Sequence, residues 1–145
     1  MSRKRYFTLA EANAQVSVLQ RVFIGVLQIR SQLKVLYERL DAAGFAPRQD
    51  EADTLPDDAP SDILRDRAKF YGLVEALREQ VEEIHATGAQ IKDIETGLVD
   101  WPARNANREI LLCWRFGERE IGFWHDADTG FAGRRPVSEL DDLTR

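Results

Sequence analysis

Two apolar seams in the first half of the chain constrain its fold more than any other feature, because they match each other position by position. The first seam steps alternately by three and four residues and comprises Leu19, Val22, Val26, Ile29, Leu33, Leu36 and Leu40. The second follows the same steps at Ile63, Arg67, Phe70, Val74, Leu77, Val81 and Ile84. This 3.5-residue period is typical of helices that pack lengthwise on each other. In a folded-back chain the numbers of every facing pair add up to 103, so we predict a long antiparallel helical hairpin resembling a coiled coil.

Local signals predict the ends of the first helix. Thr8 and Glu11 have the spacing of a capping box, in which each side chain binds the backbone amide of the other residue. Gly44 follows the last seam residue and suits the left-handed conformation that often ends a helix. We therefore expect the first helix at about residues 9–43.

The second helix follows an acidic loop. Residues 44–60 combine prolines with a cluster of acids, and we predict that they form a flexible loop. Ser61 and Asp62 then offer a capping side chain and a negative charge at a helix start. Since Gly88 can end this helix, we expect it at about residues 61–87.

The second half of the chain alternates apolar and polar residues with period two, which indicates strands. Residues 109–116 and 121–126 have the pattern of a β-hairpin, and residues 98–103 and 90–94 are expected to add two more short strands. Pro102 has no N–H donor and should restrict its strand to a sheet edge or to the end of the strand.

Length and composition agree with one α+β domain over residues 1–145, in which a β-meander and a C-terminal loop occupy residues 89–145.

Cys113 is the only cysteine, so no internal disulfide can form and we expect a cytoplasmic protein. The longest apolar run, residues 22–27, is far too short to span a membrane. A net charge of −5 argues against nucleic acid as the main partner, although residues 1–43 alone carry +4.

Chemically versatile residues concentrate in the run WHDADTGFAGRRPV, residues 124–137. The candidate ligand-binding residues in it are His125, Asp126, Asp128, Arg134 and Arg135. They combine a base, acids and cations with glycines that permit unusual backbone angles. Such a mixture on a loop beside a rigid sheet suits the binding of a small ligand.

Four segments carry a recognisable pattern: RYFTLAEANA near the start, then GLVDWPA and EILLCWRFGE, and finally IGFWHDADTGFAGRRPV. They resemble a bacterial family of unknown function, number 2203 in the domain-of-unknown-function series. The resemblance covers nearly the whole chain apart from the acidic loop. It implies that a family motif is matched by His125, Asp126, Gly130, Gly133, Arg134, Arg135 and Pro136. It implies no activity.

Two kinds of site are open at this run, each beside a structural interpretation. His125, Asp126 and Asp128 offer nitrogen and oxygen ligands for a divalent metal ion, but neighbouring residues of a strand point to opposite faces. Arg134 and Arg135 could hold a phosphate or carboxylate, or one of them could pair with an aspartate and lock the chain end onto the sheet. We assign no metal and no cofactor.

Support for catalysis is weaker. Cys113 lies in mid-strand, and we interpret it as a buried structural thiol. The three tryptophans are interpreted as core residues rather than as an aromatic binding wall. Glu118 and Glu120 lie near Asp126 and Asp128 in the sequence and could pair carboxylates for hydrolysis, but acids in turns are usually only solvated.

The first helix carries more apolar residues than a hairpin seam can bury, among them Val16, Phe23, Ile24, Leu27, Val35 and Tyr37. A two-helix hairpin cannot hide such a surface alone, so the C-terminal half or a second copy must cover it. We therefore predict a non-enzymatic homodimeric scaffold or protein-interaction module, with a further protein partner possible through the first helix. The alternative is a small-ligand, anion or metal-binding protein or enzyme with its site at the loop His125–Arg135.

Overall fold

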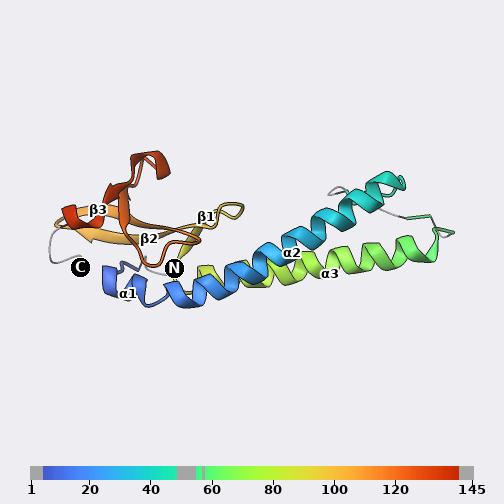
Figure 1. The fold of residues 1–145 in the computed structure, drawn as a ribbon, viewed down its shortest axis with the longest axis horizontal. Coiled ribbons are helices and arrows are strands. Elements are labelled where there is room, and N and C mark those ends of the chain that lie inside the picture. Colours follow the sequence, from blue (N-terminus) through green and yellow to red (C-terminus); the bar gives the residue numbers. More distant parts are fainter. Residues whose placement is uncertain (1–4, 49–54, 57, 141–145) are drawn as a thin grey trace. The chain divides into compact units, whose positions relative to one another are not determined.

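The computed structural model describes residues 5–48, 55–56 and 58–140. It shows the predicted α+β class, with helices followed by an antiparallel sheet (Figure 1). The chain divides into two compact units. One, here called the sheet unit, joins the residues up to Ile24 with those from Val81 onward, and the other, the hairpin unit, is Gly25–Gln80. The single domain over residues 1–145 stays a prediction.

The predicted first helix is interrupted near its start. Helix α1 covers Leu9–Asn13 and helix α2 covers Val16–Ala42, with a turn between them. At this turn the Gln15 Oε1 atom accepts hydrogen bonds from Trp101 Nε1 at 2.9 Å and from the Thr87 hydroxyl at 3.3 Å. These bonds connect the interruption to segments distant in sequence, and they leave no mark in the apolar periodicity.

The predicted helix ends are confirmed. The backbone N–H of Thr8 donates to Glu11 Oε1 at 2.9 Å, and that of Glu11 donates to Thr8 Oγ1 at 3.1 Å. Gly44 follows α2 with a φ of 84°. Helix α3 covers Ser61–Ala86, and Gly88 follows it with a φ of 97°.

In the hairpin unit α2 and α3 run antiparallel, as predicted. The guanidinium of Arg39 lies 2.5 Å from the Asp66 carboxylate, and the ring centroids of Tyr37 and Phe70 lie 6.4 Å apart. Of the predicted flexible loop, residues 44–60, the stretch 49–54 and residue 57 lie outside the described residues. Over the described part of the chain, no helix combines the length and apolar character needed to cross a membrane.

Arg67 is the polar member of the seam, and the structure shows how its charge is accommodated. Its side chain is buried, as are the seam residues Leu36, Leu40 and Ile63. The guanidinium donates to the carbonyl oxygen of Phe45 at 3.3 Å, just beyond the end of α2. Arg67 thus binds a backbone acceptor in the segment that follows α2.

The sheet unit contains one antiparallel sheet whose five strands are ordered as in the sequence. The strands are β1 (Gln90–Asp93), β2 (Leu98–Asn105), β3 (Arg108–Arg115), β4 (Phe123–Asp126) and β5 (Arg135–Pro136). The predicted meander is confirmed, and β5 is an addition to it. β2 and β3 pair along their whole length about the tight turn at Ala106.

Pro102 lies in the middle of β2, beside the point where β1 stops. The pairing of β1 with β2 reaches only to Asp100, so no strand lies on that flank of Pro102. The backbone N–H of Phe7 donates to the Pro102 carbonyl there at 2.7 Å. Although β2 is an inner strand, the proline therefore occupies a locally unpaired edge, because its nitrogen cannot donate to a neighbour.

The core of the sheet unit forms where the start of α2 packs on the sheet. Phe23 is fully buried, and its ring centroid lies 6.1 Å from those of Trp114 and Phe116. Val16 is also buried, whereas Ile24 remains 51% exposed. The sheet thus covers part of the apolar surplus of the first helix. The tryptophans are buried as predicted, and they are Trp101, Trp114 and Trp124.

Candidate functional sites

Three of the five predicted site residues lie at or near the surface, and they are Asp126, Asp128 and Arg135. The Asp126 carboxylate lies 3.4 Å from the guanidinium of Arg108. Arg135 pairs with Glu139 at 2.8 Å, four residues further along the chain. Asp128 is exposed. The structure therefore does not gather His125, Asp126 and Asp128 as ligands of one metal ion.

Arg134 is the part-buried cation of the C-terminal segment. Its guanidinium donates to Glu118 Oε1 at 2.7 Å and to the Cys113 carbonyl at 3.3 Å. It also lies 4.1 Å from the ring centroid of Phe123 and 4.7 Å from that of Phe131. A guanidinium held by a carboxylate, a carbonyl and two rings fastens the segment to the sheet. The predicted structural role of an arginine is thus fulfilled, with a glutamate as partner instead of an aspartate.

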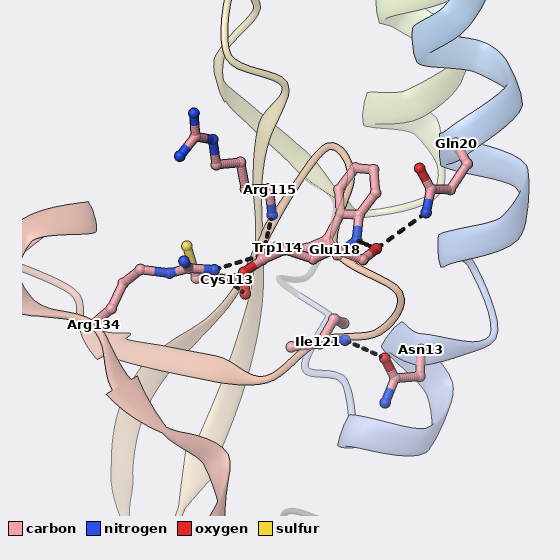
Figure 2. A network of polar contacts seen from close by, with 8 residues as sticks. All are labelled: Asn13, Gln20, Cys113, Trp114, Arg115, Glu118, Ile121 and Arg134. Carbon is pink, nitrogen blue, oxygen red and sulfur yellow. Dashed lines mark hydrogen bonds and ion pairs between the residues drawn. The ribbon is translucent and has the colours of Figure 1, made fainter.

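Glu118 is the centre of this polar network (Figure 2). Besides Arg134, its carboxylate accepts a bond from the backbone N–H of Arg115 at 2.6 Å. Its backbone carbonyl accepts bonds from Trp114 Nε1 at 2.9 Å and from Gln20 Nε2 at 3.0 Å. One turn residue therefore connects α2, β3 and the C-terminal segment. This role leaves Glu118 little freedom to act as a catalytic acid.

His125 leads to a buried cluster that the local sequence did not indicate. Its Nε2 lies 3.0 Å from Asp100 Oδ2, and its Nδ1 lies 2.7 Å from the carbonyl oxygen of Asp126. Cys113 completes the cluster, since one potential ligand atom of each of the three side chains lies within 4.8 Å of the others. His125 and Asp100 are each 2% exposed and Cys113 is fully buried.

Strand register brings the three residues of this cluster together. Asp100 of β2 faces Cys113 of β3, and His125 of β4 faces Leu111, two residues before Cys113. Paired residues of antiparallel strands lie on the same face, as do residues two apart. The three side chains therefore share one face of the sheet.

Burial controls the protonation of the cluster. Burial raises the pKa of the Asp100 carboxyl above its usual value, while the neighbouring His125 opposes the rise. Burial also raises the pKa of the Cys113 thiol to about 12, and the adjacent Asp100 adds to this effect. A neutral thiol is a poor nucleophile, so Cys113 does not have the properties of a catalytic cysteine.

The hairpin unit carries an exposed aromatic patch, which we define as Tyr37, Leu64, Phe70 and Tyr71. Phe70 stands between the two tyrosines, with its ring centroid 6.4 Å from that of Tyr37 and 5.6 Å from that of Tyr71. Leu64 is seven residues before Tyr71 and so lies on the same side of α3. Leu64, Tyr37 and Tyr71 are 47%, 43% and 39% exposed.

A second apolar surface lies in the sheet unit, between the start of α2 and the end of α3. It is a groove of about 300 Å³ whose apolar lining includes Val18, Leu19, Val22 and Ile84. Val18 is 49% exposed. The groove has few polar groups and resembles a place for an apolar side chain rather than a catalytic cleft.

Residues 5–137 match the model of a protein family described as Uncharacterized conserved protein (DUF2203). The chain belongs to this family. The DUF2203 match extends from the segment before α1 through β5, so it includes the buried cluster and the aromatic patch. No curated protein and no solved structure matches the chain. Membership in DUF2203 assigns no activity, and the function must be argued from the geometry.

Two features of this DUF2203 sequence point to Asp100 and Cys113, which the sequence analysis did not group with His125. Asp100 is a lone acid inside the otherwise apolar strand LVDWPA. A tight turn after that strand fixes the register in which Asp100 faces Cys113. By contrast, no sequence pattern distinguishes Glu118, since its bonds depend on how the turn, α2 and the C-terminal segment meet.

Proposed function

We propose that this DUF2203 protein is a non-enzymatic interaction module whose helical hairpin associates with that of a second copy to form a homodimer. The observation that carries the proposal is the exposed aromatic patch of the hairpin unit. Tyr37 and Tyr71 expose large rings beside the leucine of the patch. Tyrosine and arginine are enriched at the centres of protein interfaces, where they contribute most of the binding free energy.

The hairpin chemistry supports binding by a protein surface rather than by a small molecule. Two helices have no third layer of their own to cover the outer faces. Arg67 lies 5.5 Å from the Tyr71 ring centroid, so a cation is already held against the patch. Exposed rings that are tilted or edge-on to each other provide area and stacking geometry for contact with a protein surface.

A second copy is the partner that this patch suits best. A twofold dimer brings the same patch of both copies together, and the patch must therefore complement itself. Aromatic and aliphatic side chains meet this condition, because like rings attract each other when stacked or tilted, whereas a patch of one charge repels itself. Pairing of two hairpins would give a four-helix, coiled-coil-like arrangement.

The single cysteine supports a place of action in the cytoplasm, which is part of this proposal. Cys113 is a free, buried thiol. Secreted domains of this size often rely on disulfides, which this chain cannot form internally.

Sedimentation velocity or native mass spectrometry at several concentrations tests the dimer. We expect twice the chain mass for the wild type, and an increase in dissociation constant of at least about tenfold for the double variant Tyr37→Ala/Tyr71→Ala, since hot-spot truncations cost 2 kcal/mol or more. Val35→Ala is the matched control, because Val35 is 54% exposed but lies outside the patch. A monomeric wild type, or an equal loss in the control, would contradict the proposal.

The groove beside Val18 supports a second candidate, in which an amphipathic helix of the second copy binds there instead of at the hairpin patch. Such helices bind apolar grooves through residues spaced by one helical turn. Val18→Arg separates the two ideas. If the hairpin patch forms the dimer, Val18→Arg should keep the dimer mass. If the variant is monomeric instead, we would conclude that the second copy binds in the groove.

A further inference from the structure

We propose that Asp100, Cys113 and His125 form a binding site for a zinc ion on one face of the sheet. The three side chains come from β2, β3 and β4, and one potential ligand atom of each lies within 4.8 Å of the others. All three are buried. The inference is independent of the proposed dimer, since every ligand belongs to the sheet unit.

The orientation of His125 is that of a metal ligand. The carbonyl oxygen of Asp126, 2.7 Å from Nδ1, can only accept a hydrogen bond, so Nδ1 must carry a proton. This assigns Nε2 as the nitrogen that faces the Asp100 carboxylate at 3.0 Å. Metal-binding histidines usually donate their other N–H to a carbonyl or carboxylate in this way. Two electron-rich atoms at 3.0 Å need a proton between them, and a metal ion can replace this proton when the atoms move apart to about 3.3 Å.

Asp100 provides the second independent observation. Its Oδ1 atom is buried without a hydrogen-bond partner among the described residues, and besides His125 the carboxylate has only a weak hydrogen bond with the Cys113 thiol. A buried carboxylate oxygen without a partner is costly, and native proteins rarely leave one. A metal ion bound by this carboxylate removes the cost, because it supplies the missing positive partner in the interior of the protein.

The donor set selects the kind of metal. A thiolate, a carboxylate and a neutral imidazole together balance the charge of a divalent ion, which a buried site requires. Magnesium and calcium prefer six or more oxygen ligands, whereas sulfur and nitrogen favour zinc and similar transition metals. In a tetrahedral zinc site neighbouring ligand atoms are about 3.3–3.6 Å apart. The ligand atoms of the cluster lie within 4.8 Å of one another, with 3.0 Å between Nε2 and Oδ2.

Binding exchanges protons for the ion. The Cys113 thiol loses its proton, and so does the Asp100–His125 pair, which shares one across the 3.0 Å contact. Both protons pass to solvent, and the protein ligands then leave one of the four tetrahedral positions to a water molecule. Because the site is buried, we infer that the ion is taken up during folding and acts structurally by tying three strands together.

Refolding from urea with equimolar zinc, followed by desalting and elemental analysis, tests the site. We expect about one bound zinc per chain for the wild type. The amount of zinc retained should be at least about tenfold lower for Cys113→Ser and Asp100→Asn, since each variant removes one ligand. Asp128→Asn and His85→Gln are matched controls that should keep the metal, because both residues lie outside the cluster. Zinc should also raise the unfolding temperature of the wild type but not of Cys113→Ser.

Cobalt provides a readout that does not depend on any variant folding. Cobalt(II) refolded into the wild type should give the near-ultraviolet charge-transfer absorption of a cobalt–thiolate bond, since Cys113 is the only cysteine. A wild type that retains neither zinc nor this absorption would overturn the proposal and leave a proton between Asp100 and His125. Zinc retained in full by a folded Cys113→Ser protein would overturn it as well.

Discussion

Phe23 tests the packing of α2 on the sheet, and its replacement by alanine should be strongly destabilising. The side chain is fully buried, and its ring lies 6.1 Å from those of Trp114 and Phe116. Truncating a buried phenylalanine costs about 3–5 kcal/mol, which includes the cavity left behind. The two lost ring contacts favour the upper half of that range, at about 0.5–1.5 kcal/mol each. Domains of this size are stable by only about 5–15 kcal/mol, so the loss is a large fraction.

Urea unfolding followed by tryptophan fluorescence measures this effect, since all three tryptophans lie in the sheet unit. With a dependence of about 2 kcal/mol per molar urea, Phe23→Ala should lower the unfolding midpoint by about 2 M.

Ile24→Ala is the matched control for Phe23. Ile24 is the next residue of the same helix and is 51% exposed, so its truncation should change the free energy of unfolding by less than about 0.5 kcal/mol. Equal losses for the two variants, or a loss below about 1 kcal/mol for Phe23→Ala, would refute the burial of Phe23 between α2 and the sheet.

Three further predictions concern single groups. Burial raises the pKa of the Cys113 thiol to about 12. The thiol should therefore not react with Ellman's reagent at pH 8 in the folded, metal-free protein, but it should react once the protein unfolds. Prompt labelling of the folded protein would contradict the burial of Cys113. In chemical denaturation, Gly88→Ala should lower the free energy of unfolding by about 1–3 kcal/mol, because the φ of Gly88 is 97° and an added Cβ would lie 2.6 Å from an aromatic ring. The control Gly25→Ala lies in open space within α2, so this variant should be neutral or more stable. The backbone N–H of Thr8 lowers the pKa of Glu11 below 4.5 in the folded state, so the carboxylate stabilises the protein above that pH and this contribution is lost as the pH falls through the folded-state pKa. Thermal unfolding of Glu11→Gln should therefore differ from the wild type at pH 7 and converge with it at pH 3, and a constant difference would be evidence against the cap.

The helices and strands could be predicted because their signals are local. The seams of α2 and α3 repeat within each segment, and the caps at Thr8 and Gly44 need only neighbouring residues. The break between α1 and α2 could not be predicted in the same way. The turn at this break is bonded through Gln15 to Trp101, and these two residues are far apart in the sequence.

The candidate sites show the same difference between local signals, which can be predicted, and contacts between distant residues, which cannot. The sequence predicted His125 as a candidate ligand-binding residue together with its chain neighbours Asp126 and Asp128. The actual partners, Asp100 and Cys113, reach His125 through the register of three strands. Proximity along the chain is therefore a poor guide to a cluster on a sheet, where residues two apart and residues on paired strands are the true neighbours.

The outer strands of the sheet limit how copies of this protein can associate. β1 is only four residues long and its pairing is irregular between Ile91 and Asp93, while β5 is just two residues and includes Pro136. Where β1 stops, Pro102 offers no N–H and its carbonyl is occupied by Phe7. Short, irregular and proline-bearing edges resist the addition of a foreign strand. We therefore expect the sheet to be a poor template for fibril growth, which confines self-association to side-chain surfaces such as those on the helices.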